Sequence, residues 1–283
     1  MADGGPPESA RRLGLRGELG WRIASAALLI PLALVVTFLG GWVFALFWTA
    51  AALLTLSEWS ALVAPRDHKA LIGGMVSLLI ALLLLQERHA AAAMIVLAMV
   101  AASLALWDRS AKRIWLASGL FYSAAIAAPA IVLRCDEHEG FLAIIFLFAI
   151  VWTTDIAAYF TGRMLGGPKL VPHVSPSKTW TGALGGLLAA MVAGVVVGKA
   201  AALPAIFVLA MIALLLSVCA QCGDLFESWL KRRFDVKDSG RLIPGHGGIM
   251  DRLDGFMAAT LVAMFIGVLR GGMQAPGRGL LIW

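Results

Sequence analysis

Long apolar segments alternate with short polar connections along almost the whole chain. A helix needs about 20 predominantly apolar residues to cross a bilayer, and nine segments reach or approach this length. Their centres lie near Leu32, Ala51, Leu78, Ile95, Ala124, Phe148, Ala190, Ala210 and Ala263. The pattern predicts an all-α, polytopic integral membrane protein with about nine transmembrane helices and with its two ends on opposite sides.

The overall composition agrees with a chain surrounded by lipid. Apolar residues make up 60% of the 283 residues and charged residues only 14%, whereas soluble domains carry about 25% charged residues. Too few charged side chains remain to cover a water-facing surface. Composition therefore excludes an ordinary soluble globular protein.

Lys and Arg are distributed unevenly between the two sets of connections. With the N-terminus inside, only five of the 23 fall outside, namely Arg88, Arg134, Lys199, Arg270 and Arg278. Because positively charged loop residues tend to stay in the cytoplasm, we expect a cytoplasmic N-terminus and cytoplasmic loops at 162–179 and 222–253. The same bias explains much of the net charge of +6, which also suits phosphate-bearing substrates.

Composition also divides the chain into three parts. Residues 1–21, with Gly, Pro and Arg, predict a disordered cytoplasmic segment rather than a signal peptide, since no convincing cleavage site follows. Residues 22–134 hold five predicted spans, and residues 141–283 hold four spans and both polar loops, so we expect the catalytic part there. Cys219 and Cys222 form one Cys-x-x-Cys pair, and without a second pair we interpret them as packing residues rather than a zinc or redox site.

The loop between the last two predicted spans concentrates charge and glycine. Asp251 and Asp254 are three residues apart and share one face at the start of the last span, and Asp224 ends the preceding span. Neighbouring carboxylates repel unless a cation lies among them, and Mg²⁺ prefers such oxygen ligands together with phosphate. The three aspartates therefore predict a divalent-metal phosphate site. The alternative for each one alone is an interfacial residue paired with Arg252 or Lys231.

The stretch from Pro244 to Gly248 offers backbone N–H groups rather than a Walker motif. Its glycines have no Cβ, so amides can approach phosphate oxygens closely, and the helix that follows adds partial positive charge. A plain turn is the alternative. A basic run precedes the stretch and could neutralise a triphosphate or serve as a topology signal; it contains Lys231, Arg232, Arg233 and Lys237.

A second polar segment lies immediately before the seventh span. It contains Ser175, Ser177, Lys178 and Thr179. Hydroxyl groups at this position cap a helix, and a lysine can reach a phosphate group. Capping and small-residue packing explain the glycines that follow, but they give no reason for Lys178.

Two acidic residues lie within predicted spans. Asp155, in the sixth span, would be costly in lipid if ionised, so we expect it to face a polar cavity; the alternative is a hydrogen-bonded, neutral carboxyl group. Glu58 is near the cytoplasmic end of the second span. We interpret it as an interfacial residue.

The run from Ser228 to Asp254 has a long and specific pattern. It reads Ser228-x-Leu230-Lys231-Arg232-x4-Lys237-Asp238-x-Gly240-x2-Ile243-Pro244-x-His246-Gly247-Gly248-Ile249-x-Asp251-Arg252-Leu253-Asp254. This run resembles the signature of the phosphatidate cytidylyltransferase, or CDP-diacylglycerol synthase, family. The segment from Ser175 to Thr181 is similar to a second family motif, Ser-Pro-Lys-Lys-Thr-Trp-Glu, but has Ser177 and Thr181 in place of a lysine and the glutamate. The resemblance begins at about Asp155, and the earlier spans match only in being hydrophobic.

The resemblance implies a reaction in phospholipid biosynthesis. CTP and phosphatidic acid give CDP-diacylglycerol and pyrophosphate, with Mg²⁺ required and a second cation left open. The implied catalytic residues are Asp224, Lys237, Asp251 and Asp254, of which the three aspartates bind metal. The implied substrate-binding residues are Asp155, Ser175, Lys178, Lys231, Arg232, Asp238, His246, Gly247, Gly248 and Arg252. A homodimer in the bacterial cytoplasmic membrane, with its active site facing the cytoplasm and no nucleic-acid partner, is also expected.

Two other functions fit part of the sequence. A CTP-dependent kinase acting on a polyprenol or similar lipid alcohol would share the spans and the cytosolic nucleotide, but would need a base for its hydroxyl nucleophile and would release CDP. An anion transporter would use Asp155 and the basic loop, yet many transporters have two similar halves, which this sequence lacks. The Asp-Gly-x2-Ala-Arg pattern of enzymes that consume CDP-lipids is also missing from the sequence.

Overall fold

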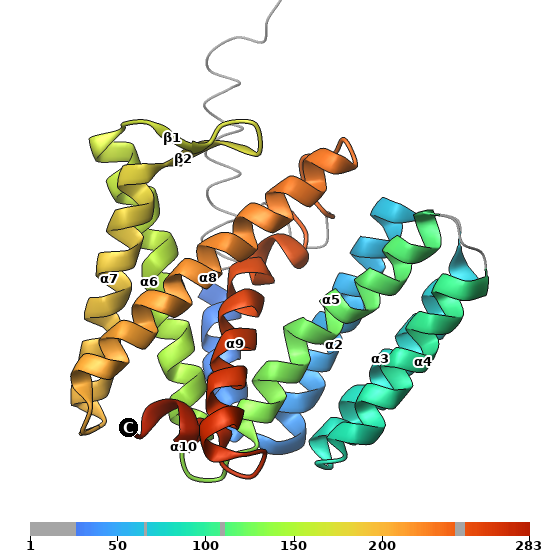
Figure 1. The fold of residues 1–283 in the computed structure, drawn as a ribbon, viewed down its shortest axis with the longest axis horizontal. Helices are drawn as coiled ribbons and strands as arrows, with labels where there is room; N and C mark the ends of the chain where they lie inside the picture. Colours follow the sequence, from blue (N-terminus) through green and yellow to red (C-terminus); the bar gives the residue numbers. More distant parts are fainter. Residues whose placement is uncertain (1–26, 65–66, 108–110, 241–246) are drawn as a thin grey trace, which may run out of the picture.

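The computed structural model describes residues 27–64, 67–107, 111–240 and 247–283, which form a bundle of long helices (Figure 1). In chain order the helices are Ala27–Leu39, α2 (Gly41–Val63), α3 (His68–Gln86), α4 (Ala90–Trp107), α5 (Ala111–Arg134), α6 (Gly140–Leu165), α7 (Trp180–Ala200), α8 (Ile206–Arg233), α9 (Met250–Gly271) and the short α10 (Pro276–Leu281). The predicted disordered segment 1–21 lies outside the described residues.

Within the described residues, seven helices are long and apolar enough to cross a membrane, namely α2, α3, α5, α6, α7, α8 and α9. The other two predicted spans correspond to apolar helices that are shorter within the described residues, Ala27–Leu39 and Ala90–Leu106. The all-α, polytopic class is therefore confirmed, and the count of nine spans stays a prediction.

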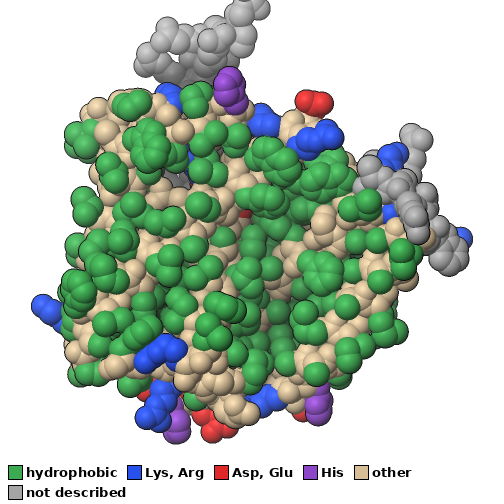
Figure 2. Space-filling view, viewed as in Figure 1, with side chains coloured by type: hydrophobic (Ala, Val, Ile, Leu, Met, Phe, Trp, Pro, Cys, Tyr) green, Lys and Arg blue, Asp and Glu red, His purple; other side chains and the backbone are tan. Residues whose placement is uncertain are grey.

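Apolar side chains cover the middle of the molecule, and most charged side chains gather at its two ends (Figure 2). Leucine, isoleucine, valine and phenylalanine on the outer helix faces are exposed, as expected where lipid rather than water surrounds the protein. The same view explains the composition, because the lipid-facing surface needs no charge.

The two described strands form a small hairpin between α6 and α7. Strand β1 (Lys169–Val171) pairs antiparallel with β2 (Ser175–Thr179), with Lys169 opposite Thr179. The Thr179 hydroxyl oxygen accepts a hydrogen bond from the Gly182 amide at 3.1 Å. The predicted helix cap is thus present, and it fixes the end of β2 to the start of α7.

Glycines allow α7 to approach α6 closely. A Cβ built at Gly182 would lie 2.7 Å from the carbonyl oxygen of Ala158, and one at Gly186 would lie 3.0 Å from that of Thr154. Such contacts leave no room for a larger side chain, which is the packing role expected of small residues in membrane helices.

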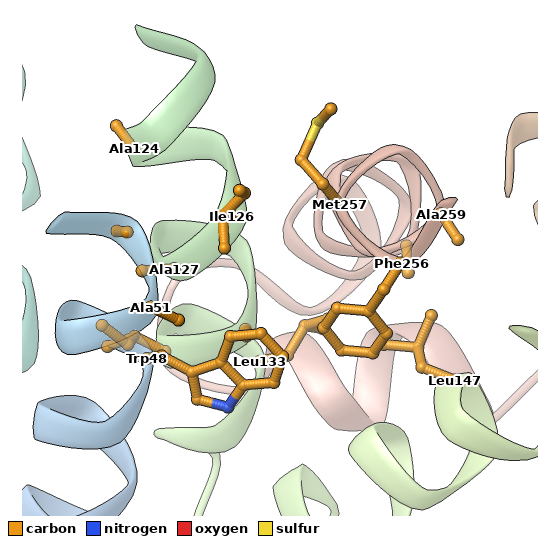
Figure 3. Packing of buried hydrophobic residues seen from close by; sticks show 14 of the residues in the cluster. Trp48, Ala51, Ala124, Ile126, Ala127, Leu133, Leu147, Phe256, Met257 and Ala259 are labelled. Atoms are coloured by element: carbon orange, nitrogen blue, oxygen red, sulfur yellow. The ribbon is translucent and has the colours of Figure 1, made fainter. Parts of the chain in front are cut away.

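Aromatic stacking joins the N-terminal helices to the C-terminal ones. Trp48 of α2 and Phe256 of α9 lie side by side (Figure 3), with ring centroids 4.8 Å apart and planes 13° from parallel. The ring of Phe148, in α6, also packs against Phe256, with ring centroids 5.2 Å apart. Three parts of the chain that are distant in sequence therefore share one core.

Both polar loops lie at the same end of the bundle, as the charge bias predicts. The hairpin and the junction of α8 with α9 occupy the upper end in Figure 1, whereas α10 lies at the opposite end. An ion pair joins Lys178 of the hairpin to Asp224 of α8. This ion pair brings charged residues from the two polar loops together.

Candidate active site

A cavity of about 1200 Å³ opens at this polar end. One part of its wall is apolar and includes Trp48, Phe148, Trp152 and Phe256. The other part carries charge and includes Asp155, Lys178, Asp224, Lys231, Arg252 and Asp254. A single space thus offers both an apolar surface and a dense set of ionisable groups.

Three carboxylates converge in the charged part. Asp224 and Glu227 are three residues apart on α8, and Asp254 comes from the second turn of α9; one oxygen of each lies within 4.8 Å of the others. Gly223 permits this approach of the two helices, because a Cβ there would lie 2.5 Å from the Asp254 carbonyl oxygen. The sequence prediction that Asp224 and Asp254 meet is therefore matched by the geometry.

The donor set fits a divalent cation. Glu227 is 1% exposed, and among the described residues its Oε1 has no hydrogen-bond partner. A buried polar atom without a partner is costly, and a hard cation between the carboxylates would supply the missing interaction. The unpartnered oxygen therefore adds an independent observation to the clustering of acids.

Asp251 lies beside this cluster but is already engaged. Its Oδ1 is 2.7 Å from Lys231 Nζ, which also lies 2.8 Å from Glu227 Oε2. Its Oδ2 accepts hydrogen bonds from the amides of Ser239 and Gly248, at 3.1 and 2.8 Å. Asp251 thus holds the loop and the lysine, and its predicted role as a metal ligand stays a prediction.

The remaining predicted site residues fall into two groups. Among the described residues, those that line the cavity are Asp155, Lys178, Asp238 and Arg252; for Asp155 this agrees with the expected polar cavity. Those that do not line it are Gly247, Gly248, the buried Ser175 and the exposed Arg232 and Lys237, although Ser177, two residues after Ser175, does line it. Gly247 adopts φ 82°, a left-handed conformation that favours glycine, and Gly248 is buried. His246 lies outside the described residues.

Two acidic residues at this end were missed or misread from the sequence. Glu227 stands three residues after Asp224 and four before Lys231, a helical spacing that could have identified it. The sequence predicts an interfacial Glu58, but this residue is only 4% exposed. Its carboxylate accepts hydrogen bonds from the amides of Ile249 and Met250, both at 2.9 Å.

Comparison with known proteins adds independent evidence. The profile described as "Cytidylyltransferase family" matches residues 20–269. Two proteins named phosphatidate cytidylyltransferase, from Brucella suis and Brucella melitensis, are each 45% identical over 261 residues, covering 92% of this chain and 97% of the relative. A protein of the same name from Bacillus subtilis is 46% identical over 128 residues, 45% of this chain and 48% of the relative. The chain therefore belongs to the cytidylyltransferase family.

Proposed function

We propose that this protein transfers the cytidylyl group of CTP to phosphatidic acid, giving CDP-diacylglycerol and pyrophosphate. The observation that supports the proposal most directly is that one cavity has both an apolar and a charged wall. A water-soluble nucleotide and a membrane lipid must meet where charged groups adjoin an apolar surface. The relatives named phosphatidate cytidylyltransferase favour this reaction over a CTP-dependent lipid kinase or an anion transporter.

The reaction needs little help from a general base. A phosphate oxygen of phosphatidic acid, already anionic at neutral pH, would attack the α-phosphorus of CTP. The bond from that phosphorus to the oxygen bridging it to the β-phosphorus would break, and pyrophosphate would leave. The enzyme must therefore bring two anions together and stabilise the charge of the leaving group.

Cations on the cavity wall suit this task. Lys178, near the end of β2, lines the cavity and forms an ion pair with Asp224, so its ammonium group can reach a phosphate bound there. Lys231 is held on two sides by Glu227 and Asp251. We propose that Lys178, Lys231 and Arg252 bind phosphate oxygens of the two substrates.

A magnesium ion is the divalent cation that we propose for the acidic cluster. The residues that would hold it are Asp224, Glu227 and Asp254, whose oxygens lie within 4.8 Å of one another. Bound there, it would neutralise phosphate charge on the nucleotide and on the departing pyrophosphate. For Asp251 to act as a further ligand, its Oδ1 would have to exchange Lys231 for the ion. The second cation suggested by the resemblance gains no support from the described residues.

The cavity would face the cytoplasm in this proposal, within a bacterial inner membrane. The Lys and Arg bias supports this orientation, and CTP is available on that side. The homodimer rests on the resemblance alone, and cross-linking of the protein in membranes would test it.

The fate of a radioactive α-phosphate tests the reaction class. Purified protein is incubated in detergent with α-labelled CTP, phosphatidic acid and Mg²⁺. We expect label in the lipid fraction and unlabelled pyrophosphate in the aqueous one. Label in aqueous CDP would instead indicate a kinase, and label remaining in CTP would refute the proposed transferase.

A further inference from the structure

Glu58 is a buried carboxylate whose hydrogen-bond partners, among the described residues, lie in the C-terminal half of the chain. It belongs to α2 and is 4% exposed. Its Oε1 accepts a hydrogen bond from the Ile249 amide at 2.9 Å, and its Oε2 accepts one from the Met250 amide at 2.9 Å. The Ser239 hydroxyl lies 3.0 Å from the same Oε2. One side chain thus contacts the α8–α9 loop at Ser239 and again where the loop joins α9.

These contacts supply the cap that α9 does not provide for itself. The first amides of a helix have no partners within the helix, and Ile249, at the N-cap position of α9, makes no side-chain cap. Glu58 accepts hydrogen bonds from two of these amides, and its negative charge also suits the positive end of the helix dipole. A residue of α2 therefore fixes where α9 begins.

Two glycines of the signature run pack closely against the Glu58 carboxylate. A Cβ at Gly240 would lie 2.6 Å from Glu58 Oε1, and a Cβ at Gly248 would lie 2.5 Å from Oε2. Any side chain at either position would push the carboxylate away from its amide partners. Close packing on Glu58, together with the Ser239 hydroxyl at Gly248, thus explains both glycines without a phosphate ligand.

Hydrogen bonds and ion pairs continue from Glu58 to the acidic cluster. The Ser239 hydroxyl lies 3.0 Å from Asp251 Oδ2 as well as from Glu58. Asp251 in turn pairs with Lys231, and Lys231 pairs with Glu227. Within the described part of the chain, Glu58 itself does not line the cavity, so it has no direct contact with a substrate placed there.

We infer that Glu58 is a positioning residue for cytidylyl transfer: it fixes the start of α9, and through Ser239 the carboxylate of Asp251, so that Lys231 and Asp254 are correctly placed. The inference rests on the proposed function. It also gives the N-terminal spans a role in the reaction, although their sequence suggests only hydrophobicity.

A matched control exists at the opposite end of the molecule. Asp136 is 3% exposed, and its carboxylate also accepts hydrogen bonds from three backbone amides, those of His138, Glu139 and Arg278. A purely structural role would make Glu58→Ala and Asp136→Ala equivalent. Both would lower the melting temperature and leave the turnover of each folded molecule unchanged.

The test compares full-length wild type, Glu58→Ala and Asp136→Ala, purified in the same detergent and counted as folded protein by size-exclusion chromatography. For Glu58→Ala we expect kcat to fall about 100-fold, since small displacements of reacting groups cost that much, while KM for phosphatidic acid changes less than about threefold. Asp136→Ala should keep the wild-type kcat. Glu58→Gln preserves the shape of the side chain and one acceptor oxygen, so its kcat should lie between those of Glu58→Ala and the wild type.

Hydrogen exchange gives a readout that does not depend on turnover. Peptides containing the Ile249 and Met250 amides should exchange faster in Glu58→Ala, and those containing His138 and Glu139 should not. Unchanged exchange at 249–250, or a wild-type kcat in folded Glu58→Ala, would overturn the inference. A wild-type protein that transfers no label from CTP would refute the proposed function instead, and the exchange result would then decide alone whether Glu58 holds α9.

Discussion

At the scale of single residues, Lys231 explains how four carboxylates can share one small region. Its ammonium group lies between Glu227 Oε2 and Asp251 Oδ1, at 2.8 and 2.7 Å, with 15% of its side chain exposed. A buried charge is tolerated only when it is paired. Lys231 pairs with one oxygen of each partner, and the other Glu227 oxygen, Oε1, is left without a hydrogen-bond partner among the described residues.

Glu227→Gln tests whether that oxygen binds a cation. The neutral amide keeps the shape but is a weaker ligand for a hard cation, so we expect the Mg²⁺ concentration for half-maximal activity to rise at least about 10-fold. Activity is measured against Mg²⁺ at saturating CTP. Glu137→Gln, an exposed change at the opposite end, is the control, and an unchanged Mg²⁺ requirement in Glu227→Gln would exclude Glu227 as a ligand.

The sequence predicts the residues of this site unevenly. Asp224 and Asp254 could be placed together because each stands next to the same loop. Glu58 could not be placed, because it meets Ile249 across 191 positions of sequence and no local pattern encodes such a contact. The sequence predicts Asp251 as a metal ligand, but its partners depend on the path of the loop backbone, which charge and spacing do not determine.

At the scale of elements, the α6–hairpin–α7 unit carries Lys178 to the site. The close approach of α7 to α6 depends on Gly182, and Thr179 ties the end of β2 to the Gly182 amide. The positions and order of the long helices followed from hydrophobic segments alone, whereas the count of nine spans stays a prediction. The hairpin did not, since its strands are only three and five residues long and lack the alternation of a half-buried strand.

Gly182→Leu should therefore disturb both packing and catalysis. A Cβ at this position already lies 2.7 Å from the Ala158 carbonyl oxygen, so we expect a destabilisation of about 1–3 kcal/mol and a raised KM for a substrate held by Lys178. Thermal unfolding in detergent and steady-state kinetics measure the two effects. Gly73→Leu is the matched control, because a Cβ there meets nothing within 4 Å; equal effects of the two changes would contradict this account.

At the scale of the whole molecule, the helices bring two chemically different environments to one end of the bundle. The apolar belt seen in Figure 2 fits a bilayer, and the cavity joins an apolar wall to the charged cluster. Trp48 and Glu58 show that α2 contributes to both the apolar wall and the support of α9. The N-terminal and C-terminal halves therefore act as one unit, although only the second carries the signature.

Cysteine labelling tests the orientation of the whole molecule. In a variant without its native cysteines, Glu137→Cys at the end that carries α10 should react with a membrane-impermeant maleimide in intact spheroplasts. Lys169→Cys in the hairpin should react only after permeabilisation, because the hairpin is expected in the cytoplasm. The opposite result for the two positions would reverse the proposed orientation and put the site on the wrong side for CTP.

The most direct test of the central claim is transfer of α-labelled cytidylyl groups into lipid by Asp254→Asn. The substitution removes one charge from the α8–α9 cluster and nearly preserves volume, and Asp136→Asn makes the same change to a buried aspartate away from the cavity. We predict that the rate of label transfer falls at least about 100-fold in Asp254→Asn while the protein remains folded. The reason is that these carboxylates, in our proposal, hold the cation that offsets phosphate charge. Wild-type transfer by folded Asp254→Asn would contradict the placement of the reaction at this cluster.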